Sequence, residues 1–181
     1  MITLPSLQYF NPHFMSLSKS HPLWKTCGDN SFEVSKAIIQ AKFLSGRYRT
    51  DKLLGHFNKT DGVCCLCSSG APGTLEHLIL LCPSLEHCRQ NQFEGLKHNR
   101  ISDISRDLII STYKTSVPNF MQLLLDCSSY PPVIQASQEY GNNILNELFK
   151  FSRTWCYNIH VTRMKMLGLY NKNGRTISTT K

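Results

Sequence analysis

A chain of 181 residues, 41% of them hydrophobic, is long enough to fill the core of one compact domain or two small lobes. Twenty Lys and Arg residues against twelve Asp and Glu residues leave a formal charge of +8, which favours polyanionic partners such as nucleic acid. No apolar run approaches the roughly 20 residues that cross a bilayer, and the N-terminus lacks the basic start and apolar centre of a signal peptide. We therefore expect an intracellular protein of the nucleus or cytoplasm, neither secreted nor bound to a membrane.

Cysteine usage agrees with a reducing compartment. The chain has eight cysteines, and three of them crowd into Cys64, Cys65 and Cys67. Such near neighbours cannot all pair with distant partners without strain. The cysteines are therefore expected to be thiols or metal ligands and not a disulfide framework.

The N-terminal part of the chain is expected to hold an arm followed by a helix. Residues 1–30 are rich in proline, serine and histidine and have no helical period, which predicts an extended arm. A helix should follow, with Ser31 as its N-cap and Gly46 at its end. Its buried face is predicted to carry the apolar residues Val34, Ile38, Ala41 and either Phe43 or Leu44.

A second, short helix is predicted to begin at the cap residue Thr50. Leu53, Leu54 and Phe57 should turn inward, whereas Lys52 and His56 should stay outside. A metal-binding segment follows from about residue 61 to residue 83.

The remainder of the chain predicts further helices. Residues 84–98, 101–110 and 117–127 each fit a short amphipathic helix, and Pro131 and Pro132 then break the chain. One long helix is expected from about Asn142 to Leu167. Its apolar stripe, which should be buried, consists of Ile144, Leu148, Phe151, Trp155 and Ile159.

These elements predict a mostly α fold: a small helical domain with a Cys-Cys-His-Cys zinc knuckle and a long C-terminal helix. The expected organisation has four consecutive parts. They are an extended arm over 1–30, basic helices and the knuckle over 31–100, a C-terminal helical region over 101–170, and a flexible tail over 171–181.

Four residues have the spacing of a zinc site. Cys64 and Cys67 supply two thiolates from a tight turn, and His77 and Cys82 complete a soft set that suits tetrahedral zinc. Thr74 can cap a helix that carries His77. On an ideal α-helix, residues five positions apart point about 140° away from each other, so the turn must unwind around Cys82. With four protein ligands and no open position, the zinc is expected to be structural.

Other interpretations of these residues remain. The Cys-x-x-Cys pair can be a redox motif, although no βαβ pattern flanks it, and all four residues can be ordinary buried side chains. Cys65 can replace Cys64 with a gap shorter by one residue. His87 or Cys88 can compete for the fourth position.

Two groups of basic residues are candidates for binding nucleic acid. The first surrounds a turn in which an aromatic ring stands between two arginines, and it consists of Lys42, Arg47, Tyr48, Arg49 and Lys52. The second lies opposite the apolar stripe of the last helix and consists of Lys150, Arg153 and Arg163. A solvated helix face is the plainer interpretation of both groups.

Motifs for catalysis are absent from the sequence. The acidic residues are dispersed, with no Asp-Asp pair of the kind that holds divalent ions in polymerases and two-metal nucleases. There is no GxxxxGK[ST] loop and no GxSxG turn. We therefore expect a protein that is not an enzyme.

The segments AKFLSGRYRTDKLLGHF and CCLCSSGAPGTLEHLILLCPSLEHCR resemble the reverse-transcriptase zinc-binding region of non-LTR retrotransposons. The likeness covers nearly the whole chain. LQYFNPHFMSLSKSHPLWKT, FMQLLLDCSSYPPVI and ELFKFSRTWCYNIHVTRMKMLG are similar to the C-terminal segment of LINE-type endonuclease and reverse-transcriptase polyproteins, which are transposable-element products.

The resemblance implies a segment that follows the polymerase domain and contacts template RNA or target DNA during target-primed reverse transcription. The family's Cys, Cys, His and Cys correspond to Cys64, Cys67, His77 and Cys82. We therefore expect a non-catalytic, zinc-binding module for RNA or single-stranded DNA. The alternative is a protein-interaction module whose last helix docks on a reverse-transcriptase core, which requires Trp155 to be exposed.

Overall fold

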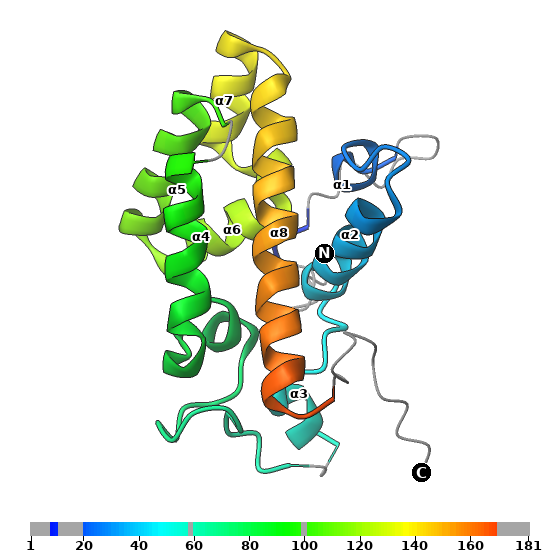
Figure 1. Ribbon diagram of the computed structural model, residues 1–181, viewed down its shortest axis with the longest axis vertical. Coiled ribbons are helices and arrows are strands. Elements are labelled where there is room, and N and C mark those ends of the chain that lie inside the picture. Colours follow the sequence, from blue (N-terminus) through cyan, green and yellow to red (C-terminus); the bar gives the residue numbers. More distant parts are fainter. Residues whose placement is uncertain (1–7, 11–19, 58–59, 99–100, 170–181) are drawn as a thin grey trace. The chain divides into compact units, whose positions relative to one another are not determined.

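A computed structural model describes residues 8–10, 20–57, 60–98 and 101–169 (Figure 1). The predicted fold class is confirmed. The described residues form helices and turns with no strand, and the long C-terminal helix α8 covers Asn143–Met166. None of the described helices has the length and apolar content that crossing a membrane requires.

The chain divides into two compact units, each assembled from separate stretches of sequence. The helical unit comprises Met1–Tyr48 and Gln92–Tyr157, and the cluster unit comprises Arg49–Asn91 and Asn158–Lys181. Helices α4 (Glu86–His98) and α8 contribute residues to both. The four consecutive parts expected from the sequence, including the tail over 171–181 that lies outside the described residues, stay a prediction.

Most helices belong to the helical unit. Besides parts of α4 and α8, it contains α1 (Pro22–Lys25), α2 (Ser31–Leu44), α5 (Asp103–Thr115), α6 (Val117–Asp126), η5 (Cys127–Ser129) and α7 (Pro131–Tyr140). Helix α6 packs against α2 and α5, and α7 packs against η5 and α5 (Figure 1). This arrangement buries the strongly apolar face of α6.

The core of the helical unit is built around Trp155, whose side chain is fully buried. The rings of Phe93, Phe120 and Phe151 lie 5.3, 5.4 and 5.6 Å from it, centroid to centroid. Such aromatic contacts add to the free energy gained from burying the ring itself. The predicted burial of the α8 stripe is confirmed for all of its five residues.

Helix α2 has nearly its predicted bounds, and Phe43 and Leu44 are buried as predicted, but other parts of its buried face differ. Asn30, not Ser31, is the N-cap, because its side-chain oxygen accepts the N–H groups of Phe32 and Glu33. Ile38 is 43% exposed, against our prediction. Gln40 is buried instead, since its amide donates to two carbonyls of α6 at 2.8 and 3.2 Å.

Two short helices were not predicted, and proline begins both. Pro22 opens a single turn, α1, inside the stretch expected to be extended, and the His21 ring accepts the N–H of Leu23 at its start. Residues 1–7 and 11–19 of that arm lie outside the described residues. Pro131 begins α7 instead of only breaking the chain. Backbone N–H groups in the first turn of a helix have no acceptor within the helix, so the N–H that proline lacks is not needed there.

The cluster unit contains little regular structure. Its short elements are α3 (Asp51–Gly55), the π-helical turn η3 (His77–Leu81) and the 3-10 turn η4 (Pro83–Leu85). The predicted cap of α3 is confirmed, since the Thr50 hydroxyl accepts the N–H of Leu53 at 3.2 Å. Between α3 and η3, an isolated antiparallel bridge joins Val63 to Pro72.

Candidate metal centre

The first two cysteines of the cluster lie on a loop closed by backbone hydrogen bonds. Cys64 donates its N–H to Ala71 at 2.9 Å, and Gly73 donates to Gly62 at 2.9 Å. The loop therefore forms a small, distorted hairpin whose ends are fixed. Cys67 lies near its tip, within 3.1 Å of the Ser69 hydroxyl.

The other two cluster residues, His77 and Cys82, are brought together by a departure from α-helical geometry. Thr74 begins this segment as predicted, because its hydroxyl accepts the N–H of His77 at 3.0 Å. The N–H of Cys82 then donates to the carbonyl of His77 at 2.6 Å. A hydrogen bond across five residues closes a wider, π-helical turn, so residues five apart lie on the same side of it. The unwinding predicted at Cys82 is therefore a widening of the preceding turn.

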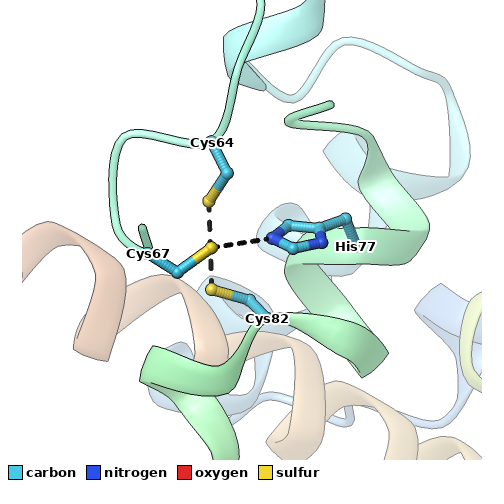
Figure 2. A group of neighbouring side chains, drawn as sticks. All are labelled: Cys64, Cys67, His77 and Cys82. Carbon is cyan, nitrogen blue, oxygen red and sulfur yellow. Dashed lines mark hydrogen bonds between the residues drawn. The ribbon is translucent and has the colours of Figure 1, made fainter. Parts of the chain in front are cut away.

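Figure 2 shows the four side chains pointing toward one another. Their ligand atoms all lie within 4.8 Å of each other. The sulfurs of Cys64 and Cys82 are 3.9 Å apart, and the sulfur of Cys67 lies 3.4 Å from Nε2 of His77. Cys64, His77 and Cys82 are buried and Cys67 is half-buried. The four predicted ligands thus form a compact Cys3His cluster that can hold a metal ion.

The alternative ligands point elsewhere. Cys65 is exposed, and both its backbone N–H and its thiol are directed at the carboxylate of Asp51, at 3.2 and 3.5 Å. His87 is exposed on α4. The sulfur of Cys88 accepts a hydrogen bond from the Thr162 hydroxyl at 3.7 Å.

The thiols of the cluster differ in acidity. Hydrogen bonds from Ser69 lower the pKa of Cys67 to about 6. Burial raises the pKa of Cys82 to about 12. A thiolate is the form that binds metals, so Cys67 is more readily available to a cation than Cys82.

Two polar residues, buried Arg89 and half-buried Ser84, support the cluster. Arg89 is 1% exposed and donates to the carbonyl oxygen of Cys82 at 2.7 Å. Ser84 donates to the carbonyl of Leu66, within the Cys64–Cys67 loop, at 2.6 Å. These bonds satisfy carbonyl groups next to the ligands and fix the direction of the chain on both sides of the cluster.

Asp51 fixes the other side of the loop. Besides accepting the N–H of Cys65, its carboxylate lies 3.2 Å from Nη2 of Arg163, and both side chains are buried. Arg163 also donates to the backbone carbonyl of Arg49 at 2.9 Å. A single guanidinium therefore holds the start of α3 and, through Asp51, the loop of Cys64 and Cys67.

Five of the residues predicted to contact nucleic acid are exposed. They are Lys42, Arg47 and Lys150 in the helical unit, and Arg49 and Lys52 in the cluster unit. Arg49 precedes Thr50, the cap of α3, and Lys52 is the second residue of that helix. These positions leave the five charged groups accessible to a polyanion.

The other three residues of that prediction are buried, so their expected place on a binding surface is wrong. Tyr48 packs its ring on Phe43 with centroids 4.0 Å apart. Arg153 is 1% exposed because it donates to Glu33 and to the backbone carbonyl of Thr26. Arg163 is 6% exposed in its bonds to Asp51 and Arg49.

Sequence reasoning missed the supporting residues Asp51 and Arg89, and it misplaced Phe57. Asp51 is the only acidic residue between Lys36 and Lys59, a signal that it pairs with a distant cation. Phe57 was predicted to turn inward and is 66% exposed. Helix α3 ends at Gly55, so helical spacing from Leu53 no longer decides where Phe57 points.

No protein-family model matches the sequence, and neither the curated proteins nor the solved structures include a match to it.

Proposed function

We propose that this chain is a zinc-stabilised, non-catalytic module that binds RNA or single-stranded DNA inside the cell. The closed Cys3His cluster is the observation that supports this proposal most directly. It stands in a chain of charge +8 that exposes lysine and arginine next to the cluster.

The spacing of the ligand atoms supports zinc as the ion. With Zn–S bonds of about 2.3 Å and Zn–N bonds of about 2.0 Å, a tetrahedral site has edges of about 3.8 Å between two sulfurs and about 3.5 Å between sulfur and nitrogen. The corresponding distances here are 3.9 Å for Cys64 and Cys82, and 3.4 Å for Cys67 and His77. Three thiols and an imidazole are also the donors that zinc prefers.

A structural role follows from the number of ligands. Four side chains complete a tetrahedral shell, which leaves no position for a water or a substrate. The bound ion would supply folding free energy to a unit that has few regular elements of its own. The protein's residues hold the ion by Cys64, Cys67, His77 and Cys82, and they orient the chain around it through Arg89 and Asp51.

The proposed phosphate contacts form two separate groups, which are Lys42, Arg47 and Lys150 in the helical unit and Arg49 and Lys52 in the cluster unit. Their charges can neutralise phosphates and release counterions. The likeness to the zinc-binding region of non-LTR retrotransposons points to the same class of ligand, and the associated protein would then be a reverse transcriptase.

The docking alternative has no observation in its favour. It required the apolar stripe of α8 to be open, with an exposed Trp155, whereas Trp155 is 0% exposed and covered by aromatic rings of the same unit.

The dependence of binding on salt tests the proposal. Replacing Arg47, Arg49 and Lys52 together by alanine should lower the magnitude of the slope of log K against log salt by roughly two, at about 0.7 per phosphate contact of a single strand. A matched control replaces Lys97, Lys114 and Lys165, which are also exposed and should leave the slope unchanged. Equal slopes for the two triple variants, or no binding by the wild-type protein, would reject the proposal.

A further inference from the structure

Phe57 is the most exposed large apolar side chain of the described residues, at 66%. A phenyl ring is normally buried, and no aromatic partner within the described residues covers this one. A single exposed aromatic residue is by itself ordinary. Its surroundings make this one informative.

Three exposed basic side chains precede Phe57 in the chain. Lys52 and His56, four residues apart, lie on one face of the α3 segment, and both are exposed. Arg49, just before the α3 cap, is exposed as well. Asp51, the acidic residue of this helix, is buried in its ion pair with Arg163 and does not offset these charges at the surface.

The backbone that carries Phe57 is held on several sides. Lys52 donates its N–H to Gly73 at 3.1 Å, and the Thr60 hydroxyl donates to the carbonyl of Asp51 at 2.9 Å. Gly55 approaches Gly62 closely, since a Cβ added to Gly55 would lie 2.9 Å from the Cα of Gly62. The ring is therefore presented by a fixed support, which limits the entropy lost when a ligand binds.

We propose that Phe57 is a base-stacking platform for a single-stranded nucleic acid, with Lys52 and Arg49 contacting the adjacent phosphates. An exposed ring next to point charges matches a strand in which each base offers a π-face beside a phosphate. A duplex hides those faces within its stack, so the ligand is an unpaired segment. This inference rests on the proposed function, and it adds a stacking contact to the proposed phosphate contacts of Arg49 and Lys52.

The experiment measures the affinity of the full-length protein, loaded with zinc, for a fluorescein-labelled oligouridylate by anisotropy. Replacing Phe57 by Ala should raise Kd by about 5- to 150-fold, the range for losing one stacked base. Phe57→Leu should weaken binding similarly, because leucine keeps apolar area but has no ring. Phe57→Trp, made together with Trp24→Phe, should keep the affinity, and its indole emission should be quenched on binding.

Controls separate stacking from other roles. Phe57→Ala should keep the wild-type salt slope, because it removes no charge, and Tyr140→Ala, which removes another exposed ring at 59%, should keep the wild-type Kd. A wild-type affinity for Phe57→Leu would indicate that apolar area without a ring is sufficient for binding, and would overturn the inference. So would an unchanged Kd for Phe57→Ala. Failure of the wild-type protein to bind any oligonucleotide would instead reject the proposed function.

Discussion

Arg163 and Asp51 form a buried ion pair next to the metal cluster. Nη2 of Arg163 lies 3.2 Å from one carboxylate oxygen of Asp51, and the other oxygen accepts the backbone N–H of Cys65. The side chains are only 7% and 8% exposed. The last turns of α8 are thereby connected to the loop that carries Cys64 and Cys67, all within the cluster unit.

Replacing Asp51 by Ala should lower the free energy of unfolding by about 3 to 5 kcal/mol, because it leaves the Arg163 guanidinium buried without its carboxylate. Urea denaturation with excess zinc measures this loss. Asp103→Ala is the control, since Asp103 is 90% exposed in its pair with Arg106 and should cost less than about 1 kcal/mol. Equal losses for the two variants would contradict the role given to Asp51.

The register of the first ligand can be tested with neighbouring cysteines. Cys64→Ser should weaken zinc binding by more than the about 10- to 100-fold typical of losing an outer-shell partner, because it removes a ligand itself. Cys65→Ser should keep zinc, since its thiol faces Asp51. Competition with a chromophoric chelator measures both affinities. The assignment is wrong if Cys65→Ser is the variant that loses the ion.

Acid should weaken the hydrogen bonds that the Glu147 carboxylate accepts in the helical unit. Burial raises the pKa of Glu147, but hydrogen bonds from Ser102 and Ser105 outweigh it and hold that pKa below its ordinary value. A carboxyl whose pKa is lower in the folded state stabilises the protein above its unfolded pKa of about 4.3, and this contribution is lost as pH falls through the folded pKa.

The stability difference between the wild-type protein and Glu147→Gln should therefore stay constant above about pH 5 and shrink as pH falls from about 5 to about 3. Urea titrations at each pH give the difference. Loss of zinc in acid affects both proteins equally and cancels. A difference that stays constant with pH would show that Glu147 is not held in its charged form by these bonds.

Trp155 provides an optical test of the helical unit. In a Trp24→Phe variant its emission should be blue-shifted and resist quenching by acrylamide, because the indole is 0% exposed. Trp24, at 43% exposed, is removed so that it does not dominate quenching. A red-shifted, readily quenched spectrum from the monomer would show that Trp155 is exposed, and would support the alternative in which α8 docks on a partner protein.

Local signals in the sequence predicted the local structure well. The cap at Thr50, the turn that begins at Thr74 and the length of α8 depend on residues within a few positions of each other. The four residues of the cluster were also predictable, because a metal site of this kind requires donors of fixed type and their spacing was short. Sequence spacing further showed that His77 and Cys82 need a departure from α-helical geometry, although not that a π-helical turn supplies it.

Contacts between distant residues were beyond such reasoning. Helical periodicity gave α8 one buried face, yet Arg153 and Arg163 on its other side are buried by residues 120 and 112 positions away, Glu33 and Asp51. A buried arginine looks like a surface arginine until its partner is known. Proline has the same ambiguity, since Pro131 can end a chain segment or begin a helix.

Native mass spectrometry of the purified full-length protein tests the central claim most directly. The cluster of Cys64, Cys67, His77 and Cys82 predicts one zinc ion per chain, which a Cys82→Ser variant should lose together with part of its helical circular-dichroism signal. A wild-type chain without zinc under metal-replete conditions, or a Cys82→Ser variant that keeps one zinc and its full helical signal, would contradict the account.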